Sequence, residues 1–378
     1  MVKVKPYEDD CCLMKYIAAS EQSKCRRLQL QGVKIPLYKF GNQSSLDNYV
    51  GLSCTHEEDQ SLLDTLLLAQ WEDRAWKGLL GYDVTTCEIK VICARRKFVC
   101  QLNEGWNMDY FPKPKEEKVF QQSELSVYCM NILREELLFS VSNGEKAIPE
   151  LIHSATVPND ANLIFVINAN PVEYGHVFLV PRGFYGLPQS MDARVLEMVT
   201  RVAVEINNCS LRIFYDFSAS IANHLYFQAC YFANPLPVEL MPVVNVLGNW
   251  QEKGIHISEV ADYPIKALTF EGNGNLKLLV EVVAEICSCL QNQDIRYCLL
   301  ISSCGKKMFL FPQLHMLATT CTLSAWECGG HFVFKERNDF DRATEDILMK
   351  RMAAVSLTDE AFEAVKQLSC SVAGKLAS

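Results

Sequence analysis

The order of apolar segments along the chain predicts an α+β fold with an antiparallel sheet. Residues 163–167 and 177–181 are continuous apolar runs on either side of a turn rich in Asn, Pro and Gly, which is typical of two strands. Residues 192–207 have helical spacing, and two more strand-like runs follow at 211–217 and 224–232. Two strands, a helix and two strands suit an antiparallel sheet better than a parallel one.

The helix predicted for 192–207 depends on the spacing of its apolar side chains. They recur every three or four residues and therefore share one face of a helix. These residues are Leu196, Val199, Val202, Ala203 and Ile206. The same pattern predicts a helix within 61–80 that ends near Gly78. Residues 86–102 predict two strands around a basic turn at 95–97, which we expect to be solvated.

The C-terminal part repeats the order helix, strand, strand, which favours two related halves. Its predicted elements are a helix at 276–291, strands at 296–301, 307–312 and 331–335, and a helical region from Thr344 onward. Pro- and Gly-containing breaks precede it. We therefore divide the chain into an irregular N-terminal extension (1–60), an N-terminal domain with the motif described below (61–245) and a C-terminal half with a terminal helix (246–378).

Composition and charge disfavour several classes of function. The 378 residues carry a net charge of −9, which argues against broad binding to nucleic acid or to anionic membranes. No apolar run reaches the ~18 residues of a membrane span, and the first residues lack the apolar core of a signal peptide. The 17 cysteines contain no Cys-x-x-Cys pair, so we expect reduced thiols in a cytosolic protein and neither a metal nor a cofactor.

The strand predicted at 224–232 carries an alternating polar motif, His224-Leu225-Tyr226-Phe227-Gln228. Side chains alternate between the two faces of a strand, so His224, Tyr226 and Gln228 share one face. A row of hydrogen-bonding groups between apolar ones can hold a ligand, although an ordinary half-exposed strand explains the pattern about equally well.

A second segment of the chain supports a ligand-binding role for this motif. At 170–182 a turn with Gly175 is followed by His176 and by an apolar strand that ends in Pro181-Arg182. This resembles the upstream half of the histidine-triad pattern, which continues after a helix to His-x-His-x-His or His-x-His-x-Gln on a later strand. Both halves occur here in that order, with a helix between them.

From about Lys34 onward the chain resembles the GDP-L-galactose phosphorylases of plants and, less closely, the GDP-D-glucose phosphorylases of animals. The resemblance is carried by five segments in particular, at 66–74, 81–88, 101–105, 135–139 and 173–177. It implies a histidine-triad-like fold similar to galactose-1-phosphate uridylyltransferase. It also implies the conversion of GDP-L-galactose and phosphate to L-galactose 1-phosphate and GDP, a step of ascorbate biosynthesis, through a covalent guanylyl-histidine.

The resemblance also assigns roles to residues of this chain. His224, the nucleophile position at Tyr226, and Gln228 form the catalytic strand, with Gln228 donating a hydrogen bond to the phosphoryl group or the leaving oxygen. Nucleotide contacts are expected from the flanking turn and strands. These residues are Asn168, Asn170, Pro171, His176, Arg182 and Asn223. For the two Asn residues and Pro171, ordinary turn chemistry is an equally good explanation.

The chain departs from the family pattern at the nucleophile, because Tyr226 stands where the family has histidine. A phenol with a pKa near ~10 is only about one part in a thousand phenolate at pH 7, whereas an imidazole is largely neutral and nucleophilic there. His224 lies two residues away, roughly 6.7 Å along a strand, which is too far to substitute. We therefore expect phosphorolysis to be impaired.

Three classes of function stay open at this point. The first is a guanylyltransferase with reduced turnover, where Tyr226 is either an inherent feature or a one-base variant of a histidine codon. The second is a catalytically inactive paralogue that binds a GDP-sugar or a protein partner. The third, and least favoured, is a hydrolase. The partners expected are GDP-L-galactose or GDP-D-glucose and inorganic phosphate, with a homodimer left open. The resemblance suggests the cytoplasm, with the nucleus as a second location.

Overall fold

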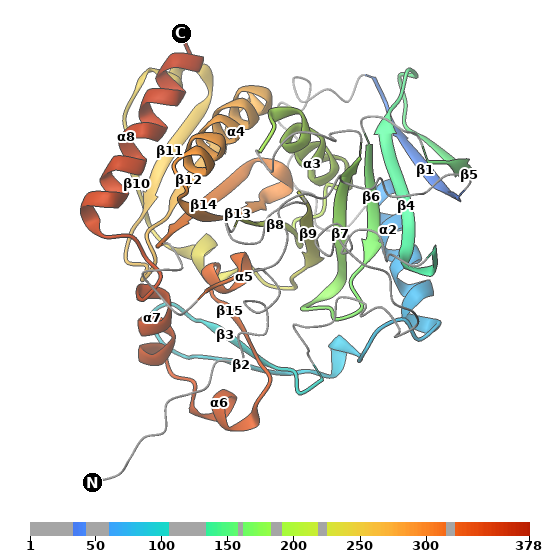
Figure 1. Cartoon of the computed structure of the whole chain (residues 1–378), viewed down its shortest axis with the longest axis horizontal. Coiled ribbons are helices and arrows are strands. Elements are labelled where there is room, and N and C mark those ends of the chain that lie inside the picture. Colours follow the sequence, from blue (N-terminus) through green and yellow to red (C-terminus); the bar gives the residue numbers. More distant parts are fainter. Residues whose placement is uncertain are drawn as a thin grey trace, which may run out of the picture.

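A mixed sheet of twelve strands runs across the computed structural model, which describes residues 33–42, 60–105, 134–157, 162–182, 191–217, 225–314 and 322–378 (Figure 1). The strand order is β10-β11-β12-β14-β13-β8-β9-β7-β6-β4-β1-β5, and all neighbours are antiparallel except β1 and β4. The bounds are β1 Lys34–Phe40, β4 Leu137–Asn143, β5 Glu150–Thr156, β6 Asn162–Ile167, β7 Tyr174–Arg182, β8 Leu211–Phe217, β9 Phe227–Tyr231, β10 Val243–Val246, β11 Ile255–Val260, β12 Leu268–Gly272, β13 Arg296–Ser302 and β14 Lys307–Gln313.

The described residues contain two copies of one topology, which confirms the related halves predicted from the sequence. In the first copy, β6 and β7 lead through helix α3 (Ala193–Ile206) to β8 and β9, which lie in the order β6-β7-β9-β8. In the second, β11 and β12 lead through α4 (Leu276–Asn292) to β13 and β14, in the order β11-β12-β14-β13. The copies meet where β8 pairs antiparallel with β13, Tyr215 opposite Leu299.

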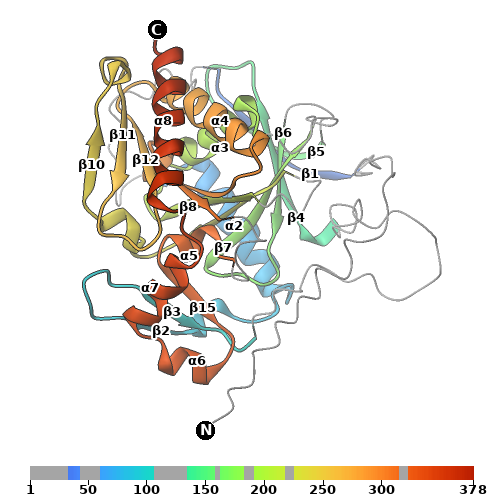
Figure 2. The same cartoon turned by 60° about the vertical axis from the view of Figure 1, so that its left-hand side comes forward.

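One face of the large sheet is covered by helices. These are α2 (Leu62–Trp76), α3, α4 and the C-terminal α8 (Asp359–Leu376), and Figure 2 shows α8 alongside α4. The sequence explains α3 well. Asp192 caps it by accepting a hydrogen bond from the backbone of Arg194, and all five of its predicted apolar positions are buried. Asn207 ends it in the left-handed conformation that Asn tolerates.

The opposite face, which carries the motif residues and is called the motif face below, is covered by a smaller layer. It consists of a three-stranded sheet in the order β15-β3-β2 and short helices, seen below the large sheet in Figure 1. The bounds are β2 Glu88–Val91, β3 Val99–Leu102, β15 His331–Phe334, α5 Ala325–Cys328, α6 Arg337–Arg342 and α7 Glu345–Ala353. Strand β15 pairs parallel with β3, so segments from both halves build this layer. The 3₁₀ turns are η2 Val84–Thr86, η4 Arg134–Glu136, η5 Pro237–Leu240, η6 Asn249–Lys253 and η7 Ser303–Gly305.

Equivalent positions of the two copies differ on the motif face. Phe214 of β8 lies opposite Gln228 of β9, and Cys298, which holds the same place in β13, lies opposite Phe311 of β14. Phe309, two residues earlier, is stacked beside Phe311 at 6.4 Å, and both rings are fully buried. The second copy therefore has packed aromatic rings where the first has motif residues.

One sequence prediction is wrong. The segment 1–60, predicted to be irregular, contains β1, which pairs with β4 and β5 and buries the side chains of Ile35, Leu37 and Phe40. The basic turn at 95–97 is solvated at Arg95 and Lys97 as predicted, but Arg95 also forms an ion pair with Asp262 at 2.5 Å and the half-buried Arg96 one with Glu345 at 3.3 Å. The strands β4, β5, β10, β11 and β12 were not predicted at all.

Every cysteine in the part of the chain that the structure describes is a free thiol. Within the same ranges no three His, Cys, Asp or Glu side chains come close enough together to hold a metal ion. Nor does any helix in those ranges have the length and apolar character needed to cross a membrane.

Candidate active site

Tyr226 and Gln228 lie on the motif face, as the alternation of the strand predicts. Gln228 lies between Phe178 of β7 and Phe214 of β8, whereas its neighbours Phe227 and Ala229 are buried in the core beneath the helices. Gln228 is half-buried, and Tyr226 directly precedes β9. The ring of Tyr226 packs edge-on against Phe178, with 5.6 Å between ring centroids. The half of the motif that the structure describes is therefore presented on one surface.

His176 of β7 holds the side chain of Gln228. The ring is 1% exposed, and its Nε2 lies 3.1 Å from Oε1 of Gln228. The backbone N–H of Val172 points at Nδ1 of the same ring at 2.9 Å. Because a backbone N–H can only donate, Nδ1 accepts, and the neutral ring carries its proton on Nε2. His176 therefore donates to the oxygen of Gln228 and leaves the amide NH₂ of Gln228 as a donor.

The turn that contains Val172 is held from the smaller sheet. Gln101 of β3 donates from Nε2 to the carbonyl of Val172 at 2.9 Å, and its own oxygen lies 2.7 Å from Nε2 of the buried His331. These bonds form one chain of donors, which runs from His331 through Gln101, Val172 and His176 to Gln228. His331 is held inside the fold by this bond, and the chain fixes which way the Gln228 amide faces.

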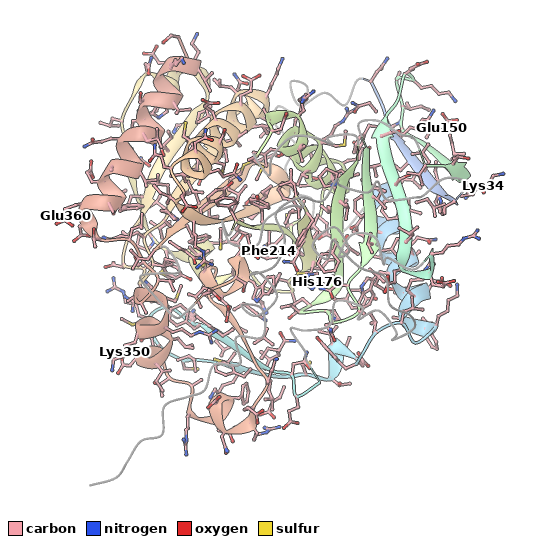
Figure 3. The ribbon with its side chains drawn as sticks, viewed as in Figure 1. Lys34, Glu150, His176, Phe214, Lys350 and Glu360 are labelled. Atoms are coloured by element: carbon pink, nitrogen blue, oxygen red, sulfur yellow. The ribbon has the colours of Figure 1, made fainter. Side chains whose placement is uncertain are left out.

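A β-bulge aims His176 at its partners. The register between β7 and β9 shifts between Tyr174 and Val177, and Gly175 in this interval has a φ of +70°. A bulge re-aims the side chains beside it, and this φ suits glycine best. Trp71 of α2 donates from Nε1 to the His176 carbonyl at 3.2 Å. Figure 3 shows His176 near Phe214. The ring centroid of Trp326 lies 6.1 Å from that of His176 and 6.0 Å from that of Phe214.

We expect His176 and His331 to stay neutral well below pH 6. Burial lowers the pKa of each ring to about 4, because a charged imidazole loses its hydration there. Their folded pKa lies below the ordinary value of ~6.5, so protonation favours the unfolded chain increasingly as the pH falls from about 6.5 to about 4. Long-range ¹H–¹⁵N NMR of histidine-labelled protein checks this, with His176→Gln and His331→Gln as assignment controls. A titration midpoint above about 6 for either ring contradicts the chain of donors.

The predicted nucleotide-binding turn is well ordered by its own contacts. Asn168 accepts a hydrogen bond from the backbone of Asn170 at 2.9 Å, and Tyr82 donates to the carbonyl of Pro171. Gly81 donates from its backbone to Ala169 at 2.8 Å. Both Asn side chains are buried, so the turn chemistry weighed for them is present. Contact of Asn168, Asn170 and Pro171 with a nucleotide stays a prediction.

Three other predicted site residues are not located by their side chains. Arg182 is the last residue of β7, but its side chain is outside the described part of the structure. Asn223 and His224 lie outside the described residues altogether. His176 itself contacts Gln228 from behind and has almost no accessible surface, so any effect on a ligand passes through Gln228.

Two charged residues on the motif face were not among the site residues predicted from the sequence. Asp216 of β8 is exposed at the surface, and its carboxylate accepts a hydrogen bond from the backbone of Ala325 at 2.7 Å. The surrounding protein nevertheless removes enough hydration to raise the pKa of this carboxyl group to about 6. Arg296, the first residue of β13, is buried. A charged residue inside or beside an apolar strand was the signal available in the sequence for both.

Comparisons with known proteins find matches over most of the chain. A family model described as "GDPGP1-like, N-terminal domain" matches residues 62–230, and one described as "GDPGP1-like, C-terminal domain" matches residues 237–376. The chain is 35% identical to GDP-L-galactose phosphorylase 1 of Arabidopsis thaliana, over 91% of this chain and 82% of that protein. It is 25% identical to GDP-D-glucose phosphorylase 1 of Homo sapiens, over 76% and 77% of the two chains.

A solved structure shows the same fold. The crystal structure of yeast Ap4A phosphorylase Apa2 in complex with Ap4A superposes with a TM-score of 0.53 and covers 80% of this chain and 99% of that one. The two sequences are 15% identical. This likeness confirms the α+β, histidine-triad-like fold class predicted from the sequence.

Proposed function

We propose, on the premise that this chain belongs to the GDPGP1-like family, that it binds a GDP-hexose on the motif face and catalyses its phosphorolysis with a turnover limited by Tyr226. The substrate favoured is GDP-L-galactose, because the most similar relatives named above include a GDP-L-galactose phosphorylase at 35% identity. The products are then L-galactose 1-phosphate and GDP.

The single observation that carries this proposal is the orientation of Gln228. Its oxygen is occupied by the Nε2–H of His176, so its two amide hydrogens point away from the buried ring. Among the described residues no acceptor is bonded to that amide nitrogen. A preorganised donor two residues from the nucleophile position can stabilise charge that develops on a phosphoryl oxygen.

The reaction proceeds by two displacements in the family pattern. The nucleophile bonds to the α-phosphorus, and the bond from this phosphorus to the bridging oxygen breaks, releasing hexose 1-phosphate. An oxygen of orthophosphate then bonds to the same phosphorus, and the bond to the nucleophile breaks to release GDP. With a phenol at position 226 the first step lacks its reactive form, and the aryl phosphodiester that results is a poorer donor in the second.

A second candidate function is a binding protein without useful turnover. It is favoured by the same residue, because Tyr226 takes the place of the imidazole while the bond between His176 and Gln228 remains in place. Such a protein binds GDP or a GDP-hexose and signals occupancy to a partner.

Measuring GDP release from GDP-L-galactose, with and without orthophosphate, tests the proposal. We expect slow release that depends on phosphate, together with GDP binding seen by calorimetry. GDP binding without any phosphate-dependent release supports the binding protein instead. If GDP and GDP-hexoses both fail to bind the folded chain, both candidates are wrong.

A further inference from the structure

Arg296 is a buried arginine in which two of the three guanidinium nitrogens lack a hydrogen-bond partner. Its side chain is 7% exposed, and neither Nε nor Nη1 makes a hydrogen bond. Gln313, paired with it across β13 and β14, donates its amide to the carbonyl of Leu323 at 3.2 Å and does not turn its oxygen to the guanidinium. Burying a charge without a partner is unfavourable, so an unsatisfied guanidinium in a native fold needs an explanation.

Arg212, another buried arginine of the same sheet, has hydrogen-bond acceptors for its guanidinium, unlike Arg296. Arg212 of β8 is 5% exposed, but it forms an ion pair with Glu239 at 2.9 Å and also donates to the carbonyl of Cys209. Each donor group of Arg212 thus has an acceptor from the protein. Within the described residues no ion pair is formed by Arg296.

The strand register places Arg296 on the motif face, close to the nucleophile position. Cys298 lies opposite Asp216, so Arg296, two residues earlier, shares their face. Continuing the pairing of Phe214 with Gln228 by two residues brings Asp216 opposite Tyr226, about 5 Å away between Cα atoms. From Tyr226 to Arg296 there are two steps between neighbouring strands, β9 to β8 and β8 to β13, and a step of two residues along β13. Together these steps put the two Cα atoms roughly 12 Å apart. Two long side chains with a phosphate group between them span such a distance.

The chemistry of Arg296 selects a phosphate group as its ligand. A guanidinium presents planar N–H donors that match two oxygens of a phosphate, and such charge-assisted bonds satisfy donors that are otherwise buried and unpaired. The carboxylate of Asp216 is near enough for Arg296 to act weakly on its pKa, but among the described residues the two groups form no ion pair that would compete with a phosphate.

The proposed two-step reaction then identifies which phosphate group Arg296 binds. In a double displacement at one phosphorus, the group that leaves in the first step and the group that enters in the second occupy the same side, away from the nucleophile. We propose, resting on the function proposed above, that Arg296 binds the β-phosphoryl group of the GDP-hexose and afterwards the orthophosphate that replaces hexose 1-phosphate.

The test compares ligands that have this phosphate with one that lacks it. Orthophosphate, D-glucose 1-phosphate, GDP and GMP are titrated into the full-length wild-type chain and into Arg296→Met and Arg296→Lys variants by calorimetry. Loss of two charge-assisted hydrogen bonds is expected to weaken GDP and orthophosphate binding by about 10- to 100-fold in Arg296→Met. GMP has no β-phosphate, so its affinity is expected to change less than about twofold. Arg296→Lys keeps the charge but not the planar pair of donors, and is expected to restore part of the affinity.

Arg212→Met is the matched control, because it removes a buried arginine from the same face of the sheet. It is expected to lower the melting temperature, since Glu239 is left buried without its partner, and to leave the phosphate affinity of the folded chain unchanged. Arg296→Met has no such partner to strand and is expected to melt no lower than wild type.

The possible outcomes separate this proposal from the proposed function. If each of the three ligands, GDP, GMP and orthophosphate, binds Arg296→Met as tightly as it binds wild type, the role of Arg296 is overturned and the proposed function stands. Weakening of GMP as much as of GDP also overturns it, because the side chain then acts on the α-phosphate or on the fold. If wild type binds none of the nucleotides, both proposals fail. Parallel loss of D-glucose 1-phosphate and orthophosphate binding supports a position shared by product and acceptor, and loss of orthophosphate alone supports the acceptor.

Discussion

Replacing Tyr226 with histidine is expected to raise the rate of GDP-hexose phosphorolysis by at least about a hundredfold. At pH 7 only about one phenol in a thousand is ionised, whereas an imidazole is largely in its neutral, nucleophilic form. The surroundings are otherwise prepared for the exchange. Gln228 is already oriented by His176, and the half-buried Tyr226 packs against Phe178 at one ring edge, where the smaller imidazole fits.

The measurement is the initial rate of GDP release from GDP-L-galactose at saturating orthophosphate, for wild type, Tyr226→His and Tyr226→Phe. The phenylalanine variant is the matched control, since it keeps the ring and removes only the hydroxyl group. It is expected to retain the residual rate of wild type if the phenol does not carry the guanylyl group. A wild-type rate equal to that of Tyr226→His, or a rate abolished by Tyr226→Phe, means that Tyr226 is itself a competent nucleophile.

Gly175→Ala is expected to destabilise the fold by about 2–5 kcal/mol. Gly175 has a φ of +70°, and a Cβ atom there meets Cδ2 of Tyr231 at 2.6 Å. Tyr231 cannot move aside easily, because its ring is buried and its hydroxyl donates to Asp64 at 2.6 Å. The added methyl group must therefore either displace this ring or straighten the bulge that aims His176, and each cost adds to the unfavourable backbone conformation.

Gly78→Ala provides the control for the backbone cost alone. Gly78 follows α2 with a φ of +74°, but a Cβ atom there has nothing within 4 Å. We expect this variant to lose only about 1–2 kcal/mol, the usual cost of a left-handed alanine. Urea unfolding of both variants, followed by fluorescence, gives the comparison. Similar losses in the two variants would show that the contact with Tyr231 relaxes freely and that the bulge is not tightly held.

Local patterns in the sequence were sufficient for the strand that carries Gln228 and for the turn before His176. Alternation along 224–228 placed Tyr226 and Gln228 on one face, and the spacing of apolar residues predicted α3 almost to its ends. Each of these features depends on residues that are neighbours in the chain. The family resemblance added the roles of the residues but no contacts.

The rest of the site depends on register between segments far apart in the sequence. Gln101 and His331 meet only because β15 pairs with β3, and no local pattern indicates that a strand near the C-terminus joins an early hairpin. Asp216 and Arg296 are brought together by the pairing of β8 with β13. Strand β1 was missed for a similar reason, since a short run interrupted by Pro36 becomes a strand only between β4 and β5.

The two copies of the topology contribute different residues to the proposed site. Strand β14 is the equivalent of β9, and its Phe309 and Phe311 cover the motif face with packed aromatic rings. The second copy still contacts the first through β13, which begins at Arg296, and β15 supplies His331 to the chain of donors that ends at Gln228. The proposed reaction centre therefore draws on both copies, and we expect neither copy to form it by itself.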